Sequence, residues 1–132
     1  MPFDGTEYPR MLVLGKLDAA IEFLDDEKRW CKGSLLNLAG QMCLLGALRR
    51  VEAEEELRPL ILSAAQEVTG RRFRSIEKFN DHAKTTHTTV MAVLYRTRLG
   101  IESERYVVDR TRHDGALHRL WRGLRARLQP IG

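Results

Sequence analysis

The stretch that decides the fold runs from Ser75 to Leu99 and reads SIEKFNDHAKTTHTTVMAVLYRTRL. It opens with a short apolar turn, meets a polar corner at Asn80 and Asp81, and continues into a longer segment. Thr85 or Thr86 can cap a helix there, because a threonine hydroxyl accepts a hydrogen bond from one of the first free backbone N–H groups. Side chains of one face then recur at i, i+3, i+4 and i+7: Val90, Val93, Leu94 and Thr97. This spacing predicts an α-helix after the corner.

Four other segments carry apolar residues at helical spacing. They predict helices over about residues 9–25, from Gly40 to Val51, over about 56–69 and over about 109–128. The start of the third follows from Pro59, because proline is tolerated in the first turn of a helix. Val68 completes the apolar stripe of that helix, and Gly70 and Gly100 are natural helix ends. We expect a common core from three of the helices: Leu44, Leu48, Leu60, Ile61, Ala64, Val90 and Leu94.

These segments predict an all-α fold, a compact bundle of about five helices. At 132 residues the chain fits one domain, residues 1–132, with a basic C-terminal helix at about 109–128. Residues 34–42 remain open between a short hairpin, a loop and a helix, because glycines interrupt the pattern. Gly46 lies inside a predicted helix, which points to close approach of another backbone, with the Trp30 ring as the neighbour that we expect.

The net charge of +4 is divided unevenly. Residues 1–70 carry 8 Lys and Arg against 12 Asp and Glu, whereas residues 71–132 carry 14 against 6. Most of the positive charge in the second half is arginine, whose planar guanidinium offers paired donors to phosphate or carboxylate. The basic half is either a solubilising surface that also contacts the acidic half, or a surface for an anionic partner. Eight arginines are candidate binding residues: Arg71, Arg72, Arg74, Arg112, Arg119, Arg122, Arg125 and Arg127.

The C-terminal segment combines this charge with an apolar face formed by Leu117, Leu120, Trp121, Leu124 and Leu128. Such a face packs on its own domain, on a second copy in a homodimer, or on a partner. Arg125 and Arg127 flank it and could pair with the acids at Glu54 to Glu56. No apolar run is long enough to span a membrane, and the N-terminus lacks a signal pattern, so we expect a cytoplasmic protein without integral membrane association.

The polar corner is the candidate for chemistry, and it comprises Asn80, Asp81, His82 and His87. Capping and turn roles are one interpretation, because Asn, Asp and His bind nearby backbone at corners. A metal or acid–base site is the alternative, and it would need a further ligand such as His113 or His118. The chain has no H-E-x-x-H, no phosphate-binding loop and no nucleophile elbow, so we assign no catalytic residue, no metal and no cofactor. Cys31 and Cys43 are twelve residues apart and fit small buried residues of a reduced protein.

Three groups of residues also carry a resemblance. They are Trp30-x-x-Gly33, then Cys43-x-x-Gly46-Ala47-Leu48, and then Phe79-Asn80-Asp81 followed by Thr88 or Thr89 and Val90. Over roughly residues 11–99 the chain resembles a family of small bacterial and phage proteins that carry Trp-Asn-Asp where this chain has Phe-Asn-Asp. That family often has Glu where this chain has Thr89. The resemblance implies a small, mostly helical fold and no particular function.

Together these features favour a small binding or regulatory protein over an enzyme. An acidic protein is the partner that we expect. Nucleic-acid binding by the arginine-rich surface is one alternative, and a small enzyme or metal site at the Asn80–His87 corner is the other.

Overall fold

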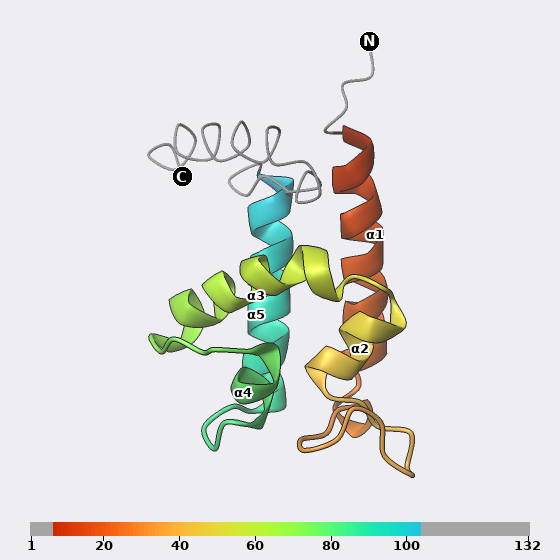
Figure 1. Cartoon of the computed structure of the whole chain (residues 1–132), viewed down its shortest axis with the longest axis vertical. Helices are drawn as coiled ribbons and strands as arrows, with labels where there is room; N and C mark the ends of the chain where they lie inside the picture. Colours follow the sequence, from red (N-terminus) through yellow and green to blue (C-terminus); the bar gives the residue numbers. More distant parts are fainter. Residues whose placement is uncertain (1–6, 104–132) are drawn as a thin grey trace.

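The computed structural model describes residues 7–103, which form a compact α-helical bundle (Figure 1). Its elements are α1 (Glu7–Leu24), the 3-10 helix η1 (Glu27–Arg29), α2 (Leu44–Arg50), α3 (Glu54–Thr69), α4 (Ile76–Asp81) and α5 (His87–Glu102). The all-α prediction is confirmed for these residues, in which bridges of β type occur only as isolated pairs. The predicted helix at about 109–128 lies outside the described residues.

Helices α1 and α5 form the long axis of the bundle and run antiparallel (Figure 1). Helix α3 crosses in front of α5, while α2 and α4 lie toward the end of the bundle where α1 finishes and α5 begins. An ion pair between Arg98 of α5 and Asp18 of α1, at 2.6 Å, fastens the two long helices together. Arg96 of α5 pairs with Glu67 of α3 at 3.1 Å. Two of the basic side chains of the second half therefore do contact acids of the first half.

One hydrophobic core joins all five helices. The seven residues predicted to share a core are all buried in it, which confirms that prediction. Thr86 caps α5, and its side chain and that of Thr89 exchange bonds with each other's backbone in a capping box. The predicted inner face of α5 is completely buried, at 0% exposure for Val90, Val93, Leu94 and Thr97.

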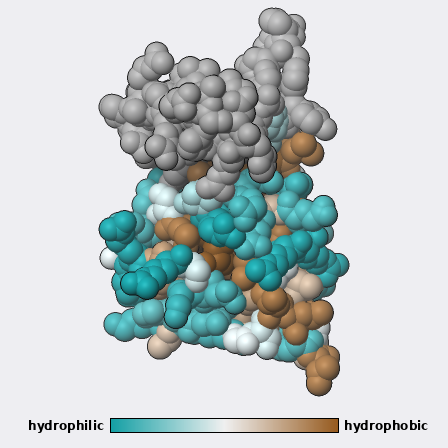
Figure 2. Space-filling view, viewed as in Figure 1, coloured by the Kyte–Doolittle hydropathy of each residue, from teal (hydrophilic) through white to brown (hydrophobic). Residues whose placement is uncertain are grey.

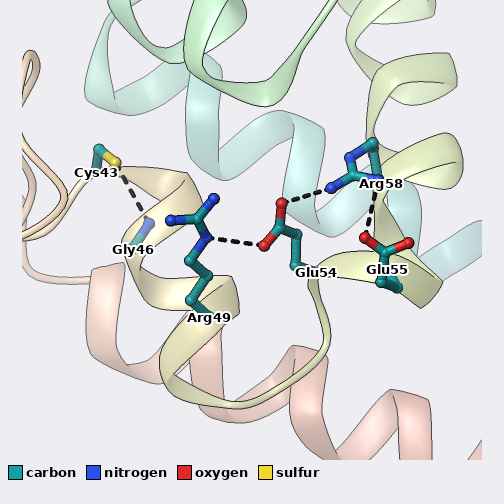
Figure 3. A network of polar contacts seen from close by, with 6 residues as sticks. All are labelled: Cys43, Gly46, Arg49, Glu54, Glu55 and Arg58. Carbon is teal, nitrogen blue, oxygen red and sulfur yellow. Dashed lines mark hydrogen bonds and ion pairs between the residues drawn. The ribbon is translucent and has the colours of Figure 1, made fainter.

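Helix α3 differs from the prediction at both ends. It begins at Glu54, so Pro59 lies in the second turn rather than the first. Glutamates favour the positive end of the helix dipole, and Glu54 is also held by Arg49 at 2.8 Å and by Arg58 (Figure 3). These contacts stabilise a first turn that the proline alone would disfavour. At the other end Val68 is 41% exposed rather than buried, so the buried stripe of α3 does not extend to Val68.

Helix α5 does not stop at Gly100 as predicted, but continues to Glu102. The next residue, Ile101, is 0% exposed in the core. Burying an isoleucine side chain contributes about 1.5–3 kcal/mol, which exceeds the roughly 1 kcal/mol cost of a glycine within a helix.

Residues 31–43 form a loop rather than a helix, and an isolated antiparallel bridge joins Leu36 to Met42 across its tip. Asn37 organises its tip, where the side-chain oxygen accepts from the N–H groups of Ala39 at 3.0 Å and Gln41 at 2.9 Å. The loop lies against α2 so closely that a Cβ on Gly46 would meet the carbonyl oxygen of Leu35 at 2.2 Å. The predicted close backbone approach at Gly46 is therefore confirmed, but its neighbour is Leu35 and not Trp30.

No helix within residues 7–103 has the length and apolar character needed to cross a membrane.

Candidate functional site

Asn80 is the polar centre of the bundle, and its side chain is completely buried. Its Oδ1 accepts hydrogen bonds from Trp30 Nε1 at 2.7 Å and from the backbone N–H of Leu44 at 3.0 Å. Its Nδ2 donates to the carbonyl oxygen of Cys31 at 3.1 Å and to Asp81 Oδ1 at 2.9 Å. An amide offers two donor and two acceptor sites, so every site of Asn80 is occupied. Asn80 therefore ties α4 to the loop and to the start of α2.

Two further contacts hold the beginning of the loop on α4. The backbone N–H of Gly33 donates to Asp81 Oδ1 at 3.0 Å, and Lys32 Nζ donates to the carbonyl oxygen of His82 at 2.7 Å. Gly33 has a φ of 79°, a left-handed conformation that favours glycine.

The two histidines of the corner go to different parts of the molecule. His87 Nε2 lies 2.6 Å from the carbonyl oxygen of Leu24 and donates to it, because a carbonyl only accepts. This bond satisfies a carbonyl at the end of α1 that the helix leaves free. His82 Nδ1 instead accepts from the N–H of Lys84 at 3.0 Å, and its ring packs edge-on against Phe73 with centroids 5.6 Å apart.

The four corner residues do not converge on one point. Asn80 and Asp81 bond to each other and to the loop, whereas His87 binds the end of α1 and His82 packs on Phe73. Within residues 7–103 no three His, Cys, Asp or Glu side chains gather so that they could hold a metal ion.

The cysteines are also placed for structure. Cys43 caps α2, where its Sγ accepts from the N–H of Gly46 at 3.3 Å (Figure 3). Both thiols are free, and burial raises the pKa of each. A raised pKa keeps a thiol protonated near neutral pH and lowers its reactivity, because the thiolate is the nucleophile.

The connection between α3 and α4 forms a basic hollow of about 400 Å³. It is lined by Arg71, Arg72, Phe73, Arg74, Lys78 and His82. Pockets of roughly 300–1,000 Å³ are typical of small-ligand sites. Within residues 7–103 the structure pairs none of the four Arg and Lys side chains with a carboxylate. The hollow therefore gathers four cations that no carboxylate of residues 7–103 neutralises.

The backbone that carries these cations is fixed at both ends. Gly70 ends α3 in a left-handed conformation, with φ of 76°. Thr69 Oγ1 then accepts from the N–H of Arg71 at 3.1 Å and donates to Ala65 O at 2.7 Å. At the other end Ser75 caps α4 by accepting from the N–H of Lys78 at 3.1 Å. The cations are thus held on a defined turn.

The middle of this turn is anchored by Phe73, which packs against the core. Its ring meets Phe79 edge-on with centroids 5.3 Å apart, and it meets His82 in the same manner. Phe79 is fully buried, so this stack connects the hollow directly to the hydrophobic core.

A family model for DUF6197, a family of unknown function, matches residues 9–98. The chain belongs to this family. The matched range includes the residues that contact Asn80 and the residues that line the basic hollow. No curated protein and no solved structure matches the chain.

The structure brings together three of the eight predicted binding arginines. Arg71, Arg72 and Arg74 share the hollow, and they are joined there by His82 from the polar corner. The other five lie outside the described residues: Arg112, Arg119, Arg122, Arg125 and Arg127. Lys78 was missed by the sequence analysis, although Ser75 three residues earlier is a favourable helix cap and would have placed Lys78 in the first turn of a short helix.

The acids predicted as partners for Arg125 and Arg127 already have partners inside the bundle. Glu54 bridges Arg49 and Arg58, and Arg58 also reaches Glu55 at 3.1 Å (Figure 3). These pairs distinguish Arg49 and Arg58 from the arginines around the hollow, which pair with no acid within residues 7–103.

A second hollow of about 280 Å³ lies between α1 and α2. Arg29 and Arg50 lie over the Phe23 ring, with guanidinium carbons 5.5 and 5.0 Å from its centroid. The Glu22 carboxylate also lines this hollow, so its charge is partly balanced.

The loop places apolar side chains in solvent. Leu36 is 60% exposed and Leu38 is 109% exposed. Figure 2 shows a brown protrusion at the lower right of an otherwise largely hydrophilic face, where Figure 1 places this loop. Exposed leucines that a hydrogen-bonded loop holds in place are suited to contact with another protein.

Proposed function

We propose that this DUF6197 protein is a non-enzymatic binding protein that recognises an acidic partner protein at the basic hollow. The carrying observation is the set of four cations around one hollow without an ion pair to any carboxylate among residues 7–103. Like charges held together repel, and an anionic partner relieves that repulsion.

A protein partner fits the surroundings of the hollow. The loop with the exposed leucines starts beside it, because Lys32 donates to the carbonyl oxygen of His82. An acidic segment in the hollow and an apolar side chain near Leu36 or Leu38 would give one partner both charge and buried apolar area.

Nucleic acid is the second candidate, because an aromatic ring accompanies the cations at Phe73. The acidic side chains of Glu77 and Asp81 weigh against it. Both are exposed on α4, which also carries Lys78 and leads to His82, so they would repel a phosphate backbone that ran along this helix.

The test compares polyglutamate with an oligothymidylate by fluorescence anisotropy at low and moderate salt. The variant Arg72→Glu with Arg74→Glu reverses two exposed charges at the hollow. The matched control, Lys28→Glu with Arg50→Glu, reverses two exposed charges elsewhere. We expect salt-dependent binding of polyglutamate that the first variant loses and the control retains.

Equal loss in both variants would mean that net charge alone drives binding, which would overturn the proposal. Absence of binding would overturn it as well. If the oligonucleotide binds and polyglutamate does not, nucleic acid replaces an acidic protein as the proposed partner.

A further inference from the structure

Arg71, which lines the hollow, carries one donor without an acceptor among residues 7–103. This donor is Nε, which is buried with an accessible area below 1 Å². A buried donor without a partner costs about 1–3 kcal/mol, and more for a charged group. Most buried polar groups in proteins are satisfied, and a shift of the Arg71 side chain toward an anion in the hollow would satisfy this donor.

The backbone of Arg71 is well fixed although its side chain lacks a partner. Thr69 holds its N–H, and Arg71 lines the hollow beside Arg72 and Arg74. A guanidinium offers Nε–H and Nη–H donors in a planar fork, which binds two oxygens of one anion side by side.

The four positive charges around the hollow favour an anion that carries more than one negative charge. A carboxylate brings one negative charge, whereas a phosphate monoester brings about −1.5 to −2 at pH 7 and three acceptor oxygens. The three arginines of the turn and Lys78 of α4 can donate to a tetrahedral group from several directions at once. A single phosphate in the hollow would also avoid the carboxylates of Glu77 and Asp81, which a continuous nucleic-acid backbone would meet.

We infer that the basic hollow is a phosphate-recognition site, which takes a phosphorylated side chain of the acidic partner with Arg71 as the central ligand. This inference rests on the proposed function and gives it a substrate class. Arg71 supplies the fork, Arg72, Arg74 and Lys78 supply charge around it, and the packing of Phe73 on Phe79 keeps the turn from collapsing.

The first experiment titrates the intact chain with phenyl phosphate, inorganic phosphate and acetate. The side-chain Nε–H resonances of the arginines are followed by nitrogen–proton NMR. We expect both phosphates to shift the Arg71 resonance to saturation, while acetate at the same ionic strength leaves it in place. Equal responses to phosphate and acetate would overturn phosphate recognition.

The second experiment separates fork geometry from charge. Arg71→Lys keeps the positive charge and removes the fork, and Arg72→Lys is the matched control at an exposed position. We expect Arg71→Lys to weaken phenyl phosphate binding at least about tenfold, since a hydrogen bond to a charged group contributes about 1.5–3 kcal/mol. Arg72→Lys should weaken it less, because Arg72 supplies charge and lysine keeps that charge.

The outcomes are distinguishable. Polyglutamate binding without phosphate selectivity, or equal phosphate loss in both variants, would refute the phosphate site and leave the acidic-partner proposal standing. Absence of binding to polyglutamate and to phosphate alike would refute both. Circular dichroism of each variant checks that the helices are intact.

Discussion

Replacing Asn80 by alanine should destabilise the whole bundle, because this side chain satisfies backbone and side-chain groups from three segments. The truncation leaves the buried N–H of Leu44, the Trp30 indole N–H and the Cys31 carbonyl without their acceptor or donor. Asp81 loses one of its two contacts but keeps the bond from Gly33.

The expected magnitude follows from the burial of these groups. The Leu44 bond is buried, and an unsatisfied buried donor costs about 1–3 kcal/mol. The Trp30 and Cys31 bonds are partly buried, so water replaces them in part and each loss costs about 1 kcal/mol. The total is about 3–5 kcal/mol, a large share of the roughly 5–15 kcal/mol that stabilises a typical domain.

The assay is urea unfolding followed by far-ultraviolet circular dichroism, together with a thermal melt in which we expect Tm to fall by roughly 10–20 °C. The matched control is Asn37→Ala, which removes an asparagine whose side chain makes three hydrogen bonds, against four for Asn80. Asn37 lies at the tip of the loop, where water can replace its contacts, so that variant should lose about 1 kcal/mol or less. Equal losses in the two variants, or a loss below about 1 kcal/mol for Asn80→Ala, would refute the central role of Asn80.

Four other predictions test the remaining features. Gly46→Ala should lower the free energy of unfolding in urea by several kcal/mol, because its Cβ would meet backbone at 2.2 Å. Gly15→Ala, with open space around it, should be neutral or stabilising by up to about 1 kcal/mol. Similar values for the two variants would disprove the close approach. Leu94→Ala removes a side chain that is 0% exposed and should cost about 2–5 kcal/mol, and a melt within a degree of the parent would contradict the packing of α5. The bond from Arg49 lowers the pKa of Glu54, so the contribution of Glu54 to stability is present above the unfolded pKa of about 4.5 and is lost as pH falls. Glu54→Gln should therefore flatten the decline of stability below pH 5 by less than about 1 kcal/mol. An unchanged pH profile would argue against the ion pair. Removal of residues 109–132 should unfold the chain if the predicted terminal helix packs on the bundle, and a folded truncation that loses self-association would assign that segment to a homodimer instead.

Local chemistry determined where most helices lie. The spacing of Val90, Val93, Leu94 and Thr97 placed a buried face on α5, and a threonine cap fixed its start, because both signals act within a few residues of the chain. Apolar spacing likewise located α1 and α2, although α2 begins at Leu44 rather than at Gly40 as predicted. Predictions from neighbouring residues failed where a tertiary contact opposed them. At Gly100, burial of Ile101 in the core favours continuation of the helix to Glu102.

The candidate site shows the same limit. The sequence identified Arg71, Arg72 and Arg74 as basic residues free to bind, since they are adjacent in the chain. It placed His82 in a different site, because linear distance does not reveal that the ring of Phe73 connects the two. It also grouped His87 with Asn80, although His87 turns away to the end of α1.

Periodicity, caps and charge thus determined the helices, the shared core and the basic character of the α3–α4 connection. Tertiary structure decided which polar groups meet. Asn80 finds partners 36 to 50 residues away at Leu44, Cys31 and Trp30. The cations around the hollow differ from Arg96 and Arg98, because no acid in the described part of the chain pairs with them. Such pairings depend on how the helices cross, and the physical reason is that hydrogen bonds and ion pairs act over a few ångströms in space, whatever the separation along the chain.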